Sequence, residues 1–155
     1  MTDRVRIAHI GVTYPHGKGY IESLLLTPVV ELVALYDSDP RSAKDHVPAE
    51  LQDLEIYDGF ARLLEKERPE AVLITQPNDT TSRFMALAAE AGVHVFAGKP
   101  CARTASELVP AVDAIQKAGV QFATGYTRHV SPAGIAIKDI VDKGLLGRLV
   151  SVEAS

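Results

Sequence analysis

The 155-residue sequence has no tryptophan and only one cysteine, Cys101. A single cysteine cannot form an internal disulfide, which is typical of a protein from a reducing compartment. No Cys or His residues stand at the spacing of metal ligands, so no metal site is predicted. The 16 basic and 20 acidic residues give a net charge of −4. Because the basic residues are scattered, this composition gives no electrostatic reason to bind nucleic acid or an anionic membrane.

Long apolar runs are also absent. No uninterrupted run reaches the roughly 20 residues of a membrane span, and the N-terminus lacks the basic-then-apolar layout of a signal peptide. The sequence is nevertheless 46% hydrophobic and 23% charged, which is enough for one globular domain with a sizeable core. We therefore predict a cytoplasmic protein whose partner is a small molecule.

The first pattern that indicates function is a strand, a loop and a helix at the start of the chain. The apolar run that includes Val5 and Ile10 stops at Gly11, and a loop rich in Gly, Thr and Pro leads to a helix near Gly17. In a parallel α/β sheet, backbone N–H groups and the positive end of the helix dipole meet at such a loop. The pattern predicts a binding site for the pyrophosphate of a dinucleotide.

The glycine fingerprint of that loop is incomplete. Gly11 fills its first position and Thr13 stands at the second, while the loop is about one residue longer than the usual G-x-G-x-x-G before Gly17. Thr13 would hold the pyrophosphate further out or donate its hydroxyl, and Val12 and His16 are further candidate contacts. A strand-to-helix turn that merely needs glycine, with a solvent-facing His16, stays open as the alternative.

A second strand, Glu31 to Tyr36, ends at Asp37. An acid about 20 positions beyond the glycine loop is typical of the residue that accepts hydrogen bonds from the adenosine ribose. With Ser38 beside it, Asp37 predicts NAD binding, and its charge would repel the 2′-phosphate of NADP, although Arg41 lies close by. The alternative is that these residues only form the turn and the helix cap.

Strands and helices alternate through the rest of the chain, and the strands are mostly apolar on both faces. This predicts an α/β fold, a Rossmann-type doubly wound parallel sheet of order 3-2-1-4-5-6. We expect further strands at 55–57, 71–75, 93–97 and 120–124, and helices at 40–46, from 60 to before Pro69, at 81–91, 104–118 and 132–143, with a new strand at 148–153. Phe84, Leu87 and Ala88 are predicted to face the core, and the histidines, His9 included, to be strand or surface residues.

Five segments together resemble the glucose-fructose oxidoreductase and inositol dehydrogenase family (Gfo/Idh/MocA): VELVALYDSDP, AVLITQPND, AEAGVHVFAGKPCA, GVQFATGYTRHVSPA and DKGLLGRLVSVEAS. In that family an N-terminal Rossmann domain binds NAD or NADP, and a C-terminal α/β domain supplies the substrate pocket and usually the oligomer interface. The resemblance implies a Rossmann domain at 1–125. It implies that residues 126–155 form a connecting helix and the first strand of a truncated C-terminal domain that is otherwise absent. It also implies a homo-oligomer.

The resemblance also implies a catalytic residue. Lys99 matches the lysine of the family's Glu-Lys-Pro motif, which lies near the nicotinamide and the reacting hydroxyl, while Gly98 replaces the glutamate. Physically, a lysine held at the end of a strand by the following Pro100 can donate a hydrogen bond to an alkoxide or carbonyl oxygen. The alternative is an ordinary surface lysine.

Two more groups of residues follow from the resemblance. Thr75, Pro77 and Asn78 resemble the Thr-Pro-Asn turn along the ribose and nicotinamide, with one extra residue between them. Tyr126 and Arg128 resemble the aromatic and basic residues that approach the nicotinamide end. For both groups a purely structural role in a turn remains open.

The sequence thus predicts the nucleotide-binding portion of an NAD(P)-dependent oxidoreductase that transfers hydride to or from a secondary alcohol of a sugar, polyol or related compound. NAD is the expected cofactor. Two alternatives remain: a dinucleotide-binding or interaction module without turnover, and an NAD-assisted lyase or glycosidase.

Overall fold

A computed structural model describes residues 4–153. The chain forms two compact units, Met1–Gly125 and Tyr126–Ser155, each of which is described by itself.

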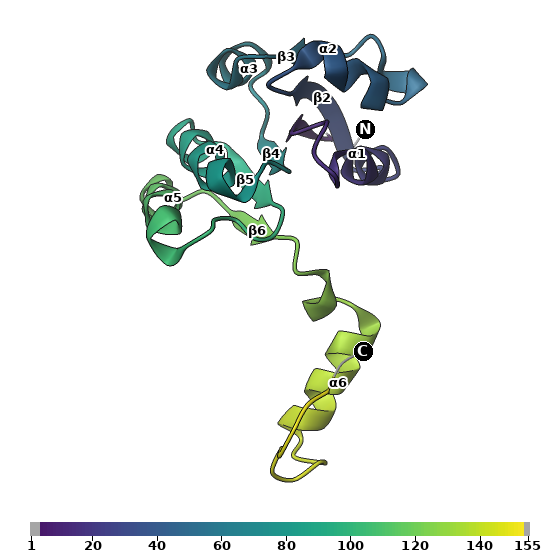
Figure 1. The fold of residues 1–155 in the computed structure, drawn as a ribbon, viewed down its shortest axis with the longest axis vertical. Helices are drawn as coiled ribbons and strands as arrows, with labels where there is room; N and C mark the ends of the chain where they lie inside the picture. The colour runs from purple at the N-terminus through teal and green to yellow at the C-terminus, as the bar shows by residue number, and fades with distance from the viewer. Residues whose placement is uncertain (1–3, 154–155) are drawn as a thin grey trace. The chain divides into compact units, whose positions relative to one another are not determined.

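The first unit is built on a six-stranded parallel sheet (Figure 1). Its strands are β1 (Val5–Ile10), β2 (Val30–Tyr36), β3 (Ile56–Tyr57), β4 (Ala71–Ile74), β5 (His94–Ala97) and β6 (Phe122–Thr124). They lie in the order β3-β2-β1-β4-β5-β6, and every neighbouring pair is parallel. The predicted strand order is confirmed, so the chain crosses between sheet halves from β3 to β4, next to β1.

Helices cover both faces of this sheet (Figure 1). They are α1 (Gly17–Leu25), α2 (Pro40–Ala43), α3 (Phe60–Glu67), α4 (Asn78–Glu90) and α5 (Ala105–Ala118), with 3₁₀ turns η1 (Lys44–His46) and η2 (Ala49–Leu51) after α2. The alternation of strand side chains divides the core in two. One face packs against α3, α4 and α5 through side chains such as Ile10, Ile74 and Met85, and the other packs against α1 and α2 through Ile21 and Leu35.

Helix α4 begins earlier than predicted. It starts at Asn78 after Pro77, whose extended backbone serves as the N-cap, so Asp79 lies in the first turn instead of capping the helix. The buried stripe includes Met85, Ala88 and Ala89, whereas Leu87 is 39% exposed. The prediction that Leu87 faces the core is therefore wrong, because α4 packs against the sheet through the stripe that contains Met85, Ala88 and Ala89.

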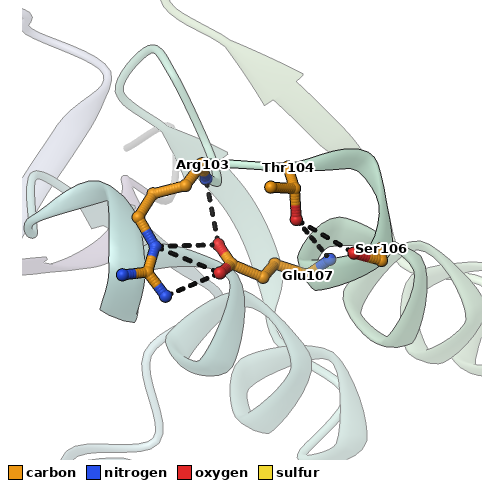
Figure 2. Close-up of polar contacts among 4 residues, drawn as sticks. All are labelled: Arg103, Thr104, Ser106 and Glu107. Atoms are coloured by element: carbon orange, nitrogen blue, oxygen red, sulfur yellow. Dashed lines mark hydrogen bonds and ion pairs between the residues drawn. The ribbon is translucent and has the colours of Figure 1, made fainter.

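Helix α5 lies where a helix was predicted, and Thr104 is its N-cap. The Thr104 hydroxyl accepts a hydrogen bond from the Glu107 backbone N–H at 3.3 Å, and the Glu107 carboxylate accepts bonds from the backbone and guanidinium of Arg103 (Figure 2). The hydrogen bonds from Arg103 lower the pKa of Glu107. Capping of this kind satisfies donors that a helix leaves free at its start, and α5 then runs through Pro110 to the left-handed Gly119.

The second unit contains the 3₁₀ turn η3 (Thr127–His129) and helix α6 (Pro132–Asp142). Ser131 caps α6 by accepting from the Gly134 N–H, and Gly144 ends the helix region with a φ of +67°. The strand predicted at 148–153 is not formed in the described part of the chain. An alternating pattern becomes a strand only by pairing with another strand, and these exposed residues have no such partner among residues 4–153.

Candidate functional site

The loop between β1 and α1 is packed against the end of β4. Gly11 has a φ of +104°, and a Cβ atom there would lie 2.3 Å from the backbone oxygen of Thr75. The Gly11 N–H donates to the oxygen of Tyr36 at 2.9 Å, at the end of β2. Only glycine suits this position. It joins the carboxyl ends of β1, β2 and β4.

Gly17 brings the start of α1 onto the same loop. A Cβ atom at Gly17 would lie 2.3 Å from the Val12 oxygen and 2.6 Å from the Gly11 oxygen. Gly17 therefore occupies the place of the last fingerprint glycine, which allows close contact of helix and strand. The first turn of α1 carries no acidic residue, so its free N–H groups and dipole favour an anion. His16 is the exposed N-cap residue and makes no side-chain cap bond.

Asp37 lies at the tip of β2 and is only 3% exposed. Its Oδ2 atom accepts from both the N–H and the hydroxyl of Thr13, at 2.8 and 2.9 Å, and its Oδ1 atom accepts from the Asp39 N–H at 3.1 Å. The Ser38 hydroxyl lies 3.5 Å from Oδ1. Thr13 thus bridges the glycine loop and the acid, an arrangement that sequence reasoning did not foresee.

The predicted turn after β4 lies at the same edge. Thr75 is buried, its N–H donates to the Ile10 oxygen at 2.7 Å, and its hydroxyl donates to the Gly11 oxygen at 2.8 Å. Pro77 and Asn78 then form the N-terminus of α4. Gly11, Asp37 and Thr75, which are far apart in sequence, are therefore joined at one edge of the sheet, as the strand order requires.

His9 is a strand residue, as predicted, and the structure adds that it is buried. It is fully buried in β1, and its Nε2 atom lies 2.9 Å from the Thr75 hydroxyl oxygen. Since that hydroxyl donates to Gly11, its oxygen accepts from Nε2–H, and the Nδ1 atom is left with no hydrogen-bond partner. Burial lowers the pKa of His9 to about 3, against a smaller upward effect of Asp37. The position of His9 within an apolar strand was the feature of the sequence that indicated its burial.

The buried His9 predicts a loss of stability on mild acidification. Between pH 6.5 and about 3 the unfolded chain binds a proton at this histidine and the folded chain does not, so the free energy of unfolding falls as the pH falls. At most this amounts to about 1.4 kcal/mol per pH unit, or about 2 kcal/mol between pH 6.5 and 5. Urea unfolding at pH 7 and pH 5 measures it. The difference should shrink in His9→Gln, and an equal pH dependence in both proteins would contradict the prediction.

Gly98 and Lys99 follow β5 at this edge. The Gly98 N–H donates to the Ile74 oxygen at 2.8 Å, which ties the end of β5 to the end of β4. A Cβ atom at Gly98 would lie 3.4 Å from that oxygen, a contact that a side chain can tolerate, so glycine is not required here. Lys99 is exposed, and the half-buried Cys101 thiol donates to the Gly98 oxygen at 3.3 Å. Tyr126 and Arg128 belong to the second unit.

The structure also has a pocket of about 710 Å³ at the opposite edge of the sheet. It lies between the C-terminal ends of α3 and α4 and is lined by apolar side chains that include Leu64, Leu87 and Val93. These residues stand next to the starts of β4 and β5, whereas the residues predicted to bind a ligand stand at the ends. The pocket is thus separate from the predicted site.

Between residues 4 and 153, no group of three or more His, Cys, Asp and Glu side chains is placed to hold a metal ion. No helix in the same range has the length and apolar character needed to cross a membrane.

Comparison with known proteins identifies similar sequences. The oxidoreductase family with an NAD-binding Rossmann fold, GFO_IDH_MocA, matches residues 5–126. Inositol 2-dehydrogenase of Burkholderia multivorans is 32% identical over 133 residues, which are 84% of this chain and 40% of that protein. The chain therefore spans less than half of the length of this relative.

Solved structures of similar fold are also known. The myo-inositol 2-dehydrogenase of Lactobacillus plantarum superposes with a TM-score of 0.84 at 25% identity, over 96% of this chain and 44% of that one. The scyllo-inositol dehydrogenase of Lactobacillus casei, solved with NAD(H) and scyllo-inositol, also gives a TM-score of 0.84, at 22% identity over 94% of this chain and 43% of that one. The second likeness concerns the fold alone.

Proposed function

The chain belongs to the Gfo/Idh/MocA family of NAD-binding oxidoreductases, and on that basis we propose that it is the nucleotide-binding portion of an NAD-dependent dehydrogenase. The observation that carries the proposal is the union of Gly11, Asp37 and Thr75 at one edge of the sheet. Two glycines there leave no room for a Cβ atom, and a buried carboxylate stands at the tip of β2. These features suit a dinucleotide.

Each part of this edge has a task in the proposal. Backbone N–H groups of Val12, Tyr14 and His16 and the start of α1 hold the pyrophosphate. Asp37, with Ser38 beside it, accepts hydrogen bonds from the adenosine ribose and repels a 2′-phosphate, which makes NAD the preferred nucleotide. The turn formed by Thr75, Pro77 and Asn78 lies along the remaining ribose and the nicotinamide.

Lys99 is the proposed catalytic residue. Bound NAD supplies or accepts the hydride in this class of reaction. The Lys99 ammonium follows β5 at the same edge and donates an N–H hydrogen bond to the substrate oxygen, which stabilises the charge that develops there. Because residue 98 is glycine, Lys99 has no carboxylate beside it, where the family's motif has a glutamate.

The substrate class follows from the relatives. The Burkholderia relative is an inositol 2-dehydrogenase, and inositol is a cyclic polyol. We propose that the whole protein acts on a secondary alcohol of a sugar or cyclic polyol.

The second unit supports a proposal about assembly. We propose that residues 126–155 begin a substrate and oligomerisation domain of a cytoplasmic homo-oligomer. Helix α6 carries Ile135 and Ile137 at 57% and 63% exposure, and large exposed apolar side chains gathered on one element are typical of an interface.

Calorimetric titration of the chain with NAD and with NADP tests nucleotide binding. We expect micromolar binding of NAD, and binding of NADP at least tenfold weaker, because a buried carboxylate faces the 2′-phosphate. Absence of binding by either nucleotide would reject the dehydrogenase proposal and favour an interaction module.

Substitution of Lys99 tests the catalytic role in the longer protein. Lys99→Met removes the ammonium but keeps an apolar stem, and we expect kcat to fall by about 10² to 10³ with little change in NAD affinity. Lys117→Met, at the exposed end of α5, is the matched control and should leave kcat unchanged. An unchanged hydride-transfer rate in Lys99→Met would exclude the role.

A further inference from the structure

A series of hydrogen bonds between polar groups is buried in the core beneath the glycine loop. Nε2–H of His9 donates to the Thr75 hydroxyl at 2.9 Å, and that hydroxyl donates to the Gly11 oxygen at 2.8 Å and approaches the Ile10 oxygen at 3.3 Å. All three links lie in the buried part of the protein. This series of hydrogen bonds ends at the Gly11 carbonyl oxygen, where the β1–α1 loop begins.

The cost of this arrangement is visible in the structure. His9 has no exposed surface, and its Nδ1 atom has no hydrogen-bond partner. A buried acceptor left without a partner destabilises a fold. The neighbours of His9 on the adjacent strands, Leu35 and Leu73, are apolar, so packing alone would favour an apolar residue at this position.

We propose that His9 is a positioning residue for the nucleotide: through Thr75 it fixes the orientation of the Gly11 peptide and hence of the phosphate-binding loop. The Thr75 hydroxyl has one proton. When Nε2–H occupies its oxygen, that proton is directed to the Gly11 carbonyl, and the peptide between Gly11 and Val12 cannot turn freely. This inference rests on the proposed nucleotide site, since the loop is the part that holds the pyrophosphate.

A coupling experiment tests the inference. Apolar variants at the two polar positions, His9→Leu and Thr75→Val, and the double variant are compared with the unchanged chain. Each single variant should weaken NAD binding about tenfold. The double variant should bind no more weakly than either single one, because both substitutions break the same series of hydrogen bonds. His9→Gln keeps a donor near the Nε2 position and should restore binding to within about threefold of the unchanged protein. Additive losses would overturn the proposal.

Two controls separate this role from general destabilisation. Leu73→Val, at the residue paired with His9 on β4, removes buried volume but leaves the hydrogen bonds of His9 and Thr75 in place. It should lower stability while leaving NAD affinity unchanged. Without nucleotide, amide hydrogen exchange in the loop from Gly11 to Gly17 should speed up about tenfold in His9→Leu but not in Leu73→Val. This second readout remains informative if NAD does not bind. Unchanged loop exchange in His9→Leu would show that the histidine does not position the loop.

Discussion

Asp37→Ala is expected to weaken NAD binding by a factor of about 10² or more. The carboxylate is buried at the tip of β2, and a hydrogen bond to a charged acceptor contributes about 1.5 to 3 kcal/mol. The variant loses the proposed acceptor for the ribose hydroxyls and also the two hydrogen bonds that Thr13 donates to Oδ2 through its N–H and hydroxyl. Calorimetry with NAD measures the change, and Asp45→Ala, an exposed acid in η1, is the control of equal charge.

NADP distinguishes the two consequences of this substitution. If Asp37 acts mainly by excluding the 2′-phosphate and holding the ribose, Asp37→Ala should bind NADP as well as or better than the unchanged chain while losing NAD. If the residue only keeps the loop in place, both nucleotides should lose affinity together. Equal binding of NAD by Asp37→Ala and the unchanged chain would remove Asp37 from the site.

The second large effect is expected at Gly17, the first residue of α1. In Gly17→Ala the new Cβ atom would meet the Val12 and Gly11 oxygens at 2.3 and 2.6 Å, and both are backbone atoms that cannot move without shifting the loop. We expect a loss of at least 2 to 3 kcal/mol in the free energy of unfolding, as for overpacking of a core, and a fall of about 5 to 10 °C in Tm. NAD binding should weaken as well, because the displaced segment is the phosphate loop.

Gly19→Ala is the matched control two residues further along the same helix. Nothing lies within 4 Å of a Cβ atom at Gly19, so alanine there should only add helix propensity and stabilise the protein by up to about 1 kcal/mol. Thermal unfolding of the two variants side by side gives the comparison. Equal Tm values would mean that α1 does not pack on the loop as described.

The sheet could be predicted because its signals are local. Apolar runs bounded by Gly, Pro and Asp marked the strands, and right-handed crossovers then left one strand order, which is confirmed. The boundaries were less certain, since Pro77 can either precede or cap a helix, and α4 begins at Asn78 instead of Thr81. The strand at 148–153 failed because alternation alone supplies no partner.

The meeting of Gly11, Asp37 and Thr75 was predictable from the sequence, whereas their side-chain contacts were not. The sequence indicated that Gly11, Asp37 and Thr75 meet, because the ends of β1, β2 and β4 lie at one edge of the sheet. It did not indicate that Thr13 donates to Asp37, since a hydroxyl in a loop can turn to a phosphate or to its own chain. The hydrogen-bond partner of the buried His9 is Thr75, 66 residues away, and no local pattern encodes that pair.

The most direct test of the nucleotide site is an NMR titration of the chain with NAD, followed through the backbone amide resonances. The largest shifts are expected at the non-proline residues of 11–17 and 75–78 and at Asp37 and Ser38, with small shifts around the pocket between α3 and α4. Shifts concentrated at that pocket, or spread over the chain without change in the glycine loop, would contradict this expectation.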